Sequence, residues 1–235
     1  LEQLGRGKDQ IPSLYQYSES EGGFYLVQEW IDGVTLKEKV RQEGKLNESS
    51  AIEILIGVLK VLDYVHSEGI IHRDIKPENI ILRSADGLPV LIDFGAVKEE
   101  LKTVSLNNNQ KSRTIAIGTP GYVPSEQLAG RPVYSSDLYG LGLTAVFLLT
   151  GKNPNHLFDL TTSKFAWRNE VLSVSSQFGD ILDKAIEDEA KNRYSTARQM
   201  LDILAELHES MLDFNKSTVT SNPKIMEKKS SLDYL

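Results

Sequence analysis

Two carboxylates, an amide and an ammonium group lie on either side of one predicted β-hairpin. Two short apolar runs, 80–82 and 90–92, flank Asp86-Gly87, a dipeptide typical of a hairpin turn. Residues just before the first strand and just after the second strand of a hairpin lie at the same end of it. We therefore expect four polar side chains to converge there: Asp74, Lys76, Asn79 and Asp93.

These four groups suit the transfer of a phosphoryl group. One carboxylate would orient and deprotonate an acceptor hydroxyl, and the lysine would neutralise phosphate charge. The second carboxylate and the amide oxygen are ligands that Mg²⁺ accepts beside phosphates. Any one of these residues alone is more simply interpreted as a solvated or capping loop residue, so the prediction depends on all four together.

The order and spacing of these residues resemble a known family. The catalytic loop and magnesium-binding motif of eukaryotic-type (bacterial Hanks-type) serine/threonine protein kinases resemble His72-Arg73-Asp74, Lys76, Asn79 and Asp93-Phe94-Gly95. The resemblance implies an α+β, protein-kinase-like fold with a mainly helical C-lobe and a remnant of the N-lobe antiparallel sheet. It also implies ATP and Mg²⁺ as cofactors and a protein substrate.

The same resemblance implies roles for individual residues. Asp74, Lys76 and Thr119 are candidate catalytic residues, and Asn79 and Asp93 are candidate metal ligands. Asp74 would act as the base, and Lys76 would stabilise charge on the transferred phosphoryl group. Lys76 and Thr119 favour the hydroxyl of Ser or Thr over the phenol of Tyr as acceptor.

Residues 28–33 resemble the kinase hinge that binds adenine. Backbone groups of Glu29 and Ile31 would hydrogen-bond the base, Gln28 would be the gatekeeper, and Ile81 would line the nucleotide site. Taken alone, the segment also fits an ordinary strand that ends in an Asp-Gly turn.

The segment 93–126 has little periodicity and resembles a kinase activation segment. Arg73, next to the candidate base, could pair with a phosphate on this segment. That pairing predicts regulatory phosphorylation at Ser112 or Thr114.

A further group of residues is expected to hold the site in place: His72, Phe94, Gly95, Glu126, Asp137 and Arg193. Glu126 closes a Pro-Ser-Glu sequence where the family usually has Ala-Pro-Glu, and we expect it to form a buried ion pair with Arg193. Asp137 is expected to accept hydrogen bonds from the backbone around His72 and Arg73. The alternative is a helix-start aspartate that the helix dipole stabilises.

Periodicity predicts the elements that must position these residues. Helices are expected over 35–42, 47–67, 138–150, 176–187 and 195–212, and strands over 13–17 and 24–30. Three regions follow: an N-lobe remnant over 1–33 (the end of helix αC, strands four and five and the hinge), a C-lobe over 34–212, and a polar linker or disordered tail over 213–235. Gly5-Arg6-Gly7 does not predict a phosphate loop, because no β-prone run precedes it.

Composition narrows the class of protein. The chain has 235 residues, of which 33 are acidic and 26 are basic, giving a formal charge of −7. Nucleic acid and anionic lipid are therefore unfavourable as main partners. The chain has no cysteine and only four scattered histidines, which argues against disulfides and a zinc site. No membrane segment or signal peptide is predicted, so the cytoplasm is the default location.

Three parts of a working kinase are not found in this sequence: the glycine-rich strand pair, the strand-three lysine and the helix-αC glutamate. They would precede residue 1, so a missing N-lobe is expected upstream and this chain alone should be nearly inactive. The alternative is a pseudokinase-like scaffold that binds without catalysis. A small-molecule phosphotransferase, such as an antibiotic kinase, shares the aspartate and metal ligands but lacks Lys76 and the docking segment 118–126.

Overall fold

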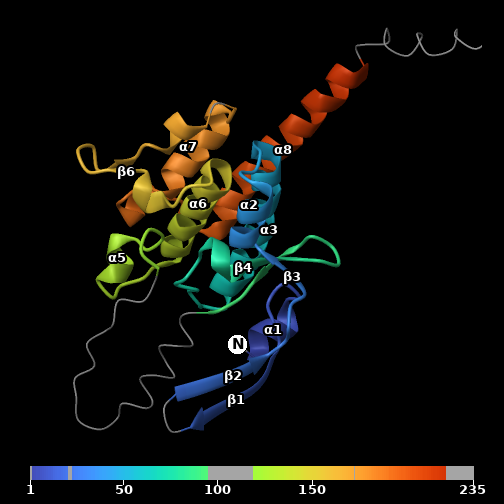
Figure 1. Ribbon diagram of the computed structural model, residues 1–235, viewed down its shortest axis with the longest axis vertical. Helices are drawn as coiled ribbons and strands as arrows, with labels where there is room; N and C mark the ends of the chain where they lie inside the picture. The colour runs from blue at the N-terminus through green and yellow to red at the C-terminus, as the bar shows by residue number, and fades with distance from the viewer. Residues whose placement is uncertain (1, 21–22, 95–118, 172, 221–235) are drawn as a thin grey trace, which may run out of the picture.

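The computed structural model describes residues 2–20, 23–94, 119–171 and 173–220 (Figure 1). Its α-helices are α1 (Glu2–Gly7), α2 (Leu36–Glu43), α3 (Glu48–Ser67), α5 (Ser125–Leu128), α6 (Tyr134–Thr150), α7 (Ser176–Ala185) and α8 (Ala197–Thr220). Its strands are β1 (Leu14–Ser20), β2 (Gly23–Gln28), β3 (Gly33–Thr35), β4 (Ile80–Arg83), β5 (Pro89–Leu91), β6 (Phe158–Asp159) and β7 (Lys164–Phe165). Short 3₁₀ helices are η1 (Pro77–Asn79), η2 (Pro154–His156), η3 (Trp167–Glu170) and η4 (Ala190–Asn192). The predicted α+β class is confirmed.

The predicted hairpin is present as β4 and β5. These strands pair antiparallel with Ile80 opposite Leu91, and β3 pairs with the other edge of β4. The backbone N–H of Ile92 donates to the carbonyl of Asn79 (3.0 Å), so the pairing continues one residue past β5. The chain therefore enters β4 and leaves β5 at the same end of the hairpin, as the turn sequence predicts.

Strands β1 and β2 form a separate two-stranded ribbon, which lies with α1 at the opposite end of the molecule from α7 (Figure 1). Both lie where β-prone runs were expected, but β2 ends at Gln28 rather than at Trp30. Its partner β1 begins at Leu14, opposite Gln28, and one further backbone bond joins Glu29 to Ser13. Trp30 lies in the connection to β3 with 88% of its surface exposed.

Helix α3 packs against both α6 and α8 (Figure 1). Its N-cap is Asn47, whose side chain accepts a hydrogen bond from the N–H of Ser50 (2.9 Å). Each large apolar side chain that it buries contributes roughly 1.5–3 kcal/mol. The predicted apolar stripe is fully buried: Ile52, Leu55, Leu59 and Leu62. This helix therefore gives the following loop a rigid support.

Helix α6 is buried along nearly its whole length, as expected for a helix that is apolar on all sides. It begins at Tyr134, before the predicted start at 138, because Ser136 Oγ accepts a hydrogen bond from the N–H of Val133 (3.0 Å). It ends at Gly151, whose φ of 70° is the left-handed conformation that glycine adopts readily. Among the described helices, none combines the length and hydrophobicity that crossing a bilayer requires.

Helix α8 extends to Thr220, so the prediction that a linker begins at residue 213 is wrong for residues 213–220. Once a helix has formed, each added residue contributes another hydrogen bond. No glycine or proline interrupts the sequence between Ala197 and Pro223. A polar composition therefore does not by itself end a helix.

Two glycines in α6 allow neighbouring segments to approach closely. A Cβ atom on Gly140 would lie 2.7 Å from the carbonyl oxygen of Ile75. A Cβ atom on Gly142 would lie 2.7 Å from Cγ2 of Ile186. Gly140 therefore allows the loop that carries Asp74 to lie directly on the buried helix.

Gly140→Ala is expected to lower the free energy of unfolding by about 1–3 kcal/mol, even after a gain of about 1 kcal/mol in helix propensity. The Ile75 backbone must also move, so amide hydrogen exchange should increase across residues 72–76. Gly142→Ala is the matched control, which should destabilise the protein without raising exchange in that loop. Urea unfolding and exchange mass spectrometry measure both effects, and equal exchange in the two variants would contradict this prediction.

Candidate active site

The loop between α3 and β4 (residues 70–76, the Asp74 loop) is held by one buried carboxylate from α6. Asp137 is 1% exposed and accepts hydrogen bonds from the backbone N–H groups of His72 (2.8 Å to Oδ2) and Arg73 (2.8 Å to Oδ1). Nε2 of His66, at the end of α3, also donates to Oδ2 (2.9 Å). The contacts expected for Asp137 are present, and they fix the Asp74 loop to the central helix.

Asp74 lies in a closed cluster of four polar side chains. Its Oδ2 accepts from Lys76 Nζ (2.9 Å) and Asn79 Nδ2 (2.8 Å), and its Oδ1 accepts from Thr119 Oγ1 (3.2 Å). Lys76 Nζ also donates to Thr119 Oγ1 (2.6 Å). The side chains of Asp74 and Lys76 are 15% and 17% exposed, so a ligand can reach them. The structure therefore brings together the three candidate catalytic residues and one candidate metal ligand.

His72 connects the Asp74 loop to the end of β5. Its Nδ1 accepts from the backbone N–H of Asp74 (3.2 Å), so its proton is on Nε2, which donates to the carbonyl of Ile92 (3.0 Å). Its ring packs against Phe94 with 4.6 Å between centroids. Burial lowers the pKa of His72 more strongly than the nearby carboxylates raise it, which keeps the imidazole neutral.

Asn79 and Asp93 lie at the open end of the hairpin, before β4 and after β5. Asn79 is buried, and its Nδ2 donates to both the backbone carbonyl and Oδ2 of Asp74 (2.8 Å each). Asp93 directly follows Ile92, which pairs with the Asn79 backbone. The φ of Asp93 is 62°, an unusual value for a non-glycine residue that is often found at functional sites. The charges of the Asp74 and Asp93 carboxylates act to raise the pKa of His72, against the stronger effect of burial.

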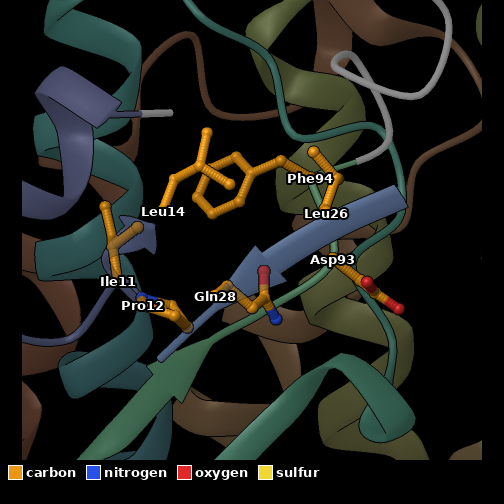
Figure 2. Close-up of a pocket in the computed structure, with 7 residues that line it drawn as sticks. All are labelled: Ile11, Pro12, Leu14, Leu26, Gln28, Asp93 and Phe94. Atoms are coloured by element: carbon orange, nitrogen blue, oxygen red, sulfur yellow. The ribbon is translucent and has the colours of Figure 1, made fainter. Parts of the chain in front are cut away.

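A pocket lies between the end of β2 and the residues that follow β5 (Figure 2). Its lining residues are Ile11, Pro12, Leu14, Leu26, Gln28, Asp93 and Phe94. The ring of Phe94 lies on the apolar side of the pocket near Leu14, whereas the carboxylate of Asp93 points away from that ring (Figure 2). The candidate gatekeeper Gln28 and the candidate metal ligand Asp93 therefore line one pocket.

The segment after β2 is fixed to the start of β1. The N–H of Glu29 donates to the carbonyl of Ser13 (2.8 Å), and the Glu29 carboxylate accepts from the Ser13 N–H (3.1 Å). The Glu29 carbonyl is then the backbone group of this residue that a ligand could use. Ile31 is buried, and Ile81 lies in the middle strand of the β3–β4–β5 sheet, opposite Val90.

Glu126 and Arg193 form the ion pair expected from the sequence. Arg193 Nη1 and Nη2 donate to Glu126 Oε1 (2.7 Å) and Oε2 (3.1 Å), and Ser136 Oγ also donates to Oε1 (2.7 Å). Burial alone would raise the pKa of Glu126, but the bonds from Arg193 and Ser136 outweigh it, and the pKa lies below its ordinary value. The Arg193 bonds fix α5 to the segment before α8, and the Ser136 bond fixes α5 to the start of α6.

Residues 2–227 match the family described as the protein kinase domain. The chain belongs to the protein kinase family. It is 54% identical over 205 residues to serine/threonine-protein kinase PknA of Nostoc sp., and 48% identical over 205 residues to serine/threonine-protein kinase C of Synechocystis sp.. Each alignment covers 87% of this kinase chain but only 36% or 38% of the relative, so the chain spans little more than a third of their length.

Solved protein kinase structures share this fold. The kinase domain of Mycobacterium tuberculosis PknI superposes with a TM-score of 0.63 at 24% identity, covering 87% of this chain and 77% of that one. The structure described as PpkA-294 in its apo form gives a TM-score of 0.67 at 25% identity, with coverages of 86% and 70%. The family and fold predicted from the catalytic-loop residues are confirmed.

Sequence reasoning missed two contacts in this kinase chain, one to the Asp74 loop itself and one to Asp137, which holds the loop. One is the bond from His66 to Asp137, and the other is from Gln127 Nε2 to the carbonyl of Arg73 (2.6 Å). Both join segments that are distant in the sequence, and neither residue belongs to a short motif that would have marked it. Three predicted site residues lie outside the described residues: Gly95, Ser112 and Thr114.

The lowered pKa of His72 predicts how stability depends on pH. The unfolded chain takes up a proton at this imidazole near pH 6.5, whereas the folded protein does so only at lower pH. Below about pH 6.5 the unfolded state therefore binds more protons, and stability falls by at most about 1.4 kcal/mol per pH unit for this group. Above pH 6.5 the titration of His72 no longer lowers the free energy of unfolding.

His72→Gln should make the stability curve flatter between pH 6.5 and 5, because the variant lacks the titrating group. Urea unfolding at several pH values measures the difference. His156→Gln removes an exposed imidazole and controls for the loss of a histidine as such. An unchanged slope in His72→Gln would contradict the prediction.

Proposed function

We propose that this chain carries part of the catalytic domain of a protein serine/threonine kinase, which transfers the γ-phosphoryl group of ATP to Ser and Thr hydroxyls. The observation that supports this most directly is the closed cluster in which Asp74 is bonded to Lys76, Asn79 and Thr119. The family membership supports the same reaction class.

In this proposal Asp74 orients the acceptor hydroxyl and takes its proton as the new O–P bond forms. A positioned general base accelerates a reaction by roughly 10²–10⁴. Lys76, at 2.9 Å from Asp74, would contact the transferred phosphoryl group and offset the charge that develops on it. Thr119 ties the carboxylate to the segment that leads into α5, where an acceptor peptide would lie.

Asn79 and Asp93 would hold Mg²⁺, whose charge offsets that of the ATP phosphates. Both Asn79 bonds to Asp74 use Nδ2, so its Oδ1 is the atom available to a cation. One carboxylate and one amide oxygen suit Mg²⁺, which takes water and phosphate oxygens as its remaining ligands. Across residues 2–94 and 119–220, where described, no group of three His, Cys, Asp or Glu forms an alternative metal site.

The adenine would lie beside Gln28 and Ile81 and would hydrogen-bond the backbone of Glu29 and Ile31. The glycine-rich strands and their lysine would come from sequence upstream of residue 1. A complete assay therefore uses the natural protein with this upstream sequence attached.

The test is transfer from radiolabelled Mg·ATP to a mixture of unfolded proteins, followed by acid hydrolysis. We expect labelled phosphoserine and phosphothreonine. Binding of Mg·ATP without any transfer would instead establish the pseudokinase-like scaffold. Labelling of an aminoglycoside but of no protein would establish a small-molecule phosphotransferase.

A further inference from the structure

A buried glutamine outside the proposed catalytic residues contacts the backbone of the Asp74 loop. Gln127, in α5, is 5% exposed, and its Nε2 donates to the carbonyl oxygen of Arg73 (2.6 Å). The side-chain nitrogen must face this carbonyl, because a carbonyl oxygen only accepts.

With this contact, both polar atoms of the peptide group that links Arg73 to Asp74 are hydrogen-bonded. Its oxygen is held by Gln127, and its N–H is held by Nδ1 of His72 (3.2 Å). The preceding N–H, that of Arg73, is held by Asp137 (2.8 Å). Rotation of the Arg73–Asp74 peptide would therefore break a bond at either end.

The backbone conformation at Arg73 explains why such fixing is needed. Its φ is 69°, in the left-handed region that is unfavourable for an L-residue with a side chain. Conformations of this kind persist only where surrounding contacts determine them. The rotation of the Arg73–Asp74 peptide sets the direction in which the Asp74 side chain leaves the backbone.

The position of Gln127 is itself determined by its neighbour in α5. Glu126 is tied to Arg193 and Ser136, so a helix of only four residues is held firmly against α6. The Gln127 bond therefore connects the segment that ends in α5 to the peptide beside the proposed base.

We propose that Gln127 is a positioning residue that holds the Asp74 carboxylate in its reactive orientation through the Arg73 carbonyl; this inference rests on the proposed kinase function. The bond from Gln127 goes to the Arg73 carbonyl, beside the proposed base, so we expect its effect on the rate of the chemical step. Small misplacements of a reacting group have large kinetic effects.

Gln127→Met keeps the length of the side chain and removes its donor. We expect kcat for phosphoryl transfer to fall about tenfold, with KM for ATP within about twofold of the unchanged protein. Leu128→Met, at an exposed neighbouring position in α5, is the matched control and should leave both constants unchanged. The measurements use the full-length natural protein.

Gln127→Glu gives a readout that a purely structural role would not produce. At high pH its carboxylate repels the Arg73 carbonyl, whereas at low pH the protonated acid can donate an O–H to it. The rate of Gln127→Glu relative to the unchanged protein should therefore rise as the pH falls from about 8 to 6, while that of Gln127→Met stays constant.

A Gln127→Met enzyme with unchanged kcat would overturn the proposal, as would parallel pH profiles for the two Gln127 variants. A loss of rate that only follows a fall in melting temperature, with KM raised as well, would also overturn it. Hydrogen exchange at the Asp74 amide gives a readout without activity and should increase in Gln127→Met. If the wild-type protein itself is inactive, the proposed kinase function is wrong, and the role of Gln127 is still tested by hydrogen exchange. If exchange at the Asp74 amide is the same in Gln127→Met and in the wild-type protein, the role of Gln127 is wrong.

Discussion

Asp74→Asn is expected to lower the rate of phosphoryl transfer by a factor of about 10²–10⁴, because asparagine cannot take a proton from the acceptor hydroxyl. This loss corresponds to about 2.7–5.5 kcal/mol of transition-state stabilisation. The measurement is kcat for transfer to a protein acceptor by the full-length natural protein.

The same change should leave the fold nearly intact. The asparagine oxygen can accept the bonds that Lys76 and Asn79 now give to Oδ2 of Asp74. Its Nδ2 can donate to Oγ1 of Thr119, which now donates to Oδ1. Urea unfolding should therefore differ little between Asp74→Asn and the unchanged protein, which separates lost chemistry from lost structure.

Asp86→Asn is the matched control. Asp86 lies in the exposed turn between β4 and β5, where its carboxylate bonds to Arg83 rather than to the Asp74 cluster. The control should retain full activity. Transfer by Asp74→Asn at the rate of the Asp86→Asn control would remove Asp74 from its role as base.

The convergence of Asp74, Lys76 and Asn79 could be predicted from the sequence because their relation to one another depends on local rules. An Asp-Gly turn between two short β-prone runs sets the register of the hairpin, and the register fixes which residues lie at its open end. Thr119 follows from no such rule, and only the family resemblance named it as a candidate catalytic residue.

Gln127 and its bond to Arg73 could not be predicted in this way. The bond depends on how α5 lies against the Asp74 loop, and the Glu126–Arg193 pair that sets this packing joins residues 67 positions apart. The end of α8 was missed for a different reason, because polarity in residues 213–220 was taken to signal an irregular chain. Polarity reports burial, whereas a helix ends where capping or a breaker ends it.

Arg193→Met is expected to lower the free energy of unfolding by about 3–5 kcal/mol, because it removes one partner of a buried ion pair. The Arg193 side chain is fully buried. Its guanidinium makes five hydrogen bonds, two to the Glu126 carboxylate and one each to the carbonyls of Ser135, Glu187 and Asp188. Methionine preserves much of the apolar volume but supplies no donor, so a partly buried carboxylate and three carbonyls lose a partner.

Arg198→Met provides the matched control on the same part of the chain. The Arg198 side chain is 61% exposed and pairs with Asp63 at the surface, so its loss should cost only about 0–1 kcal/mol. Urea unfolding at pH 7 compares the two variants, and equal losses would contradict the assignment of Arg193 as a buried anchor.

Because Glu126 directly precedes Gln127, Arg193→Met should also loosen the contact with the Arg73 carbonyl. The rate of transfer should therefore fall at temperatures where this variant is still folded.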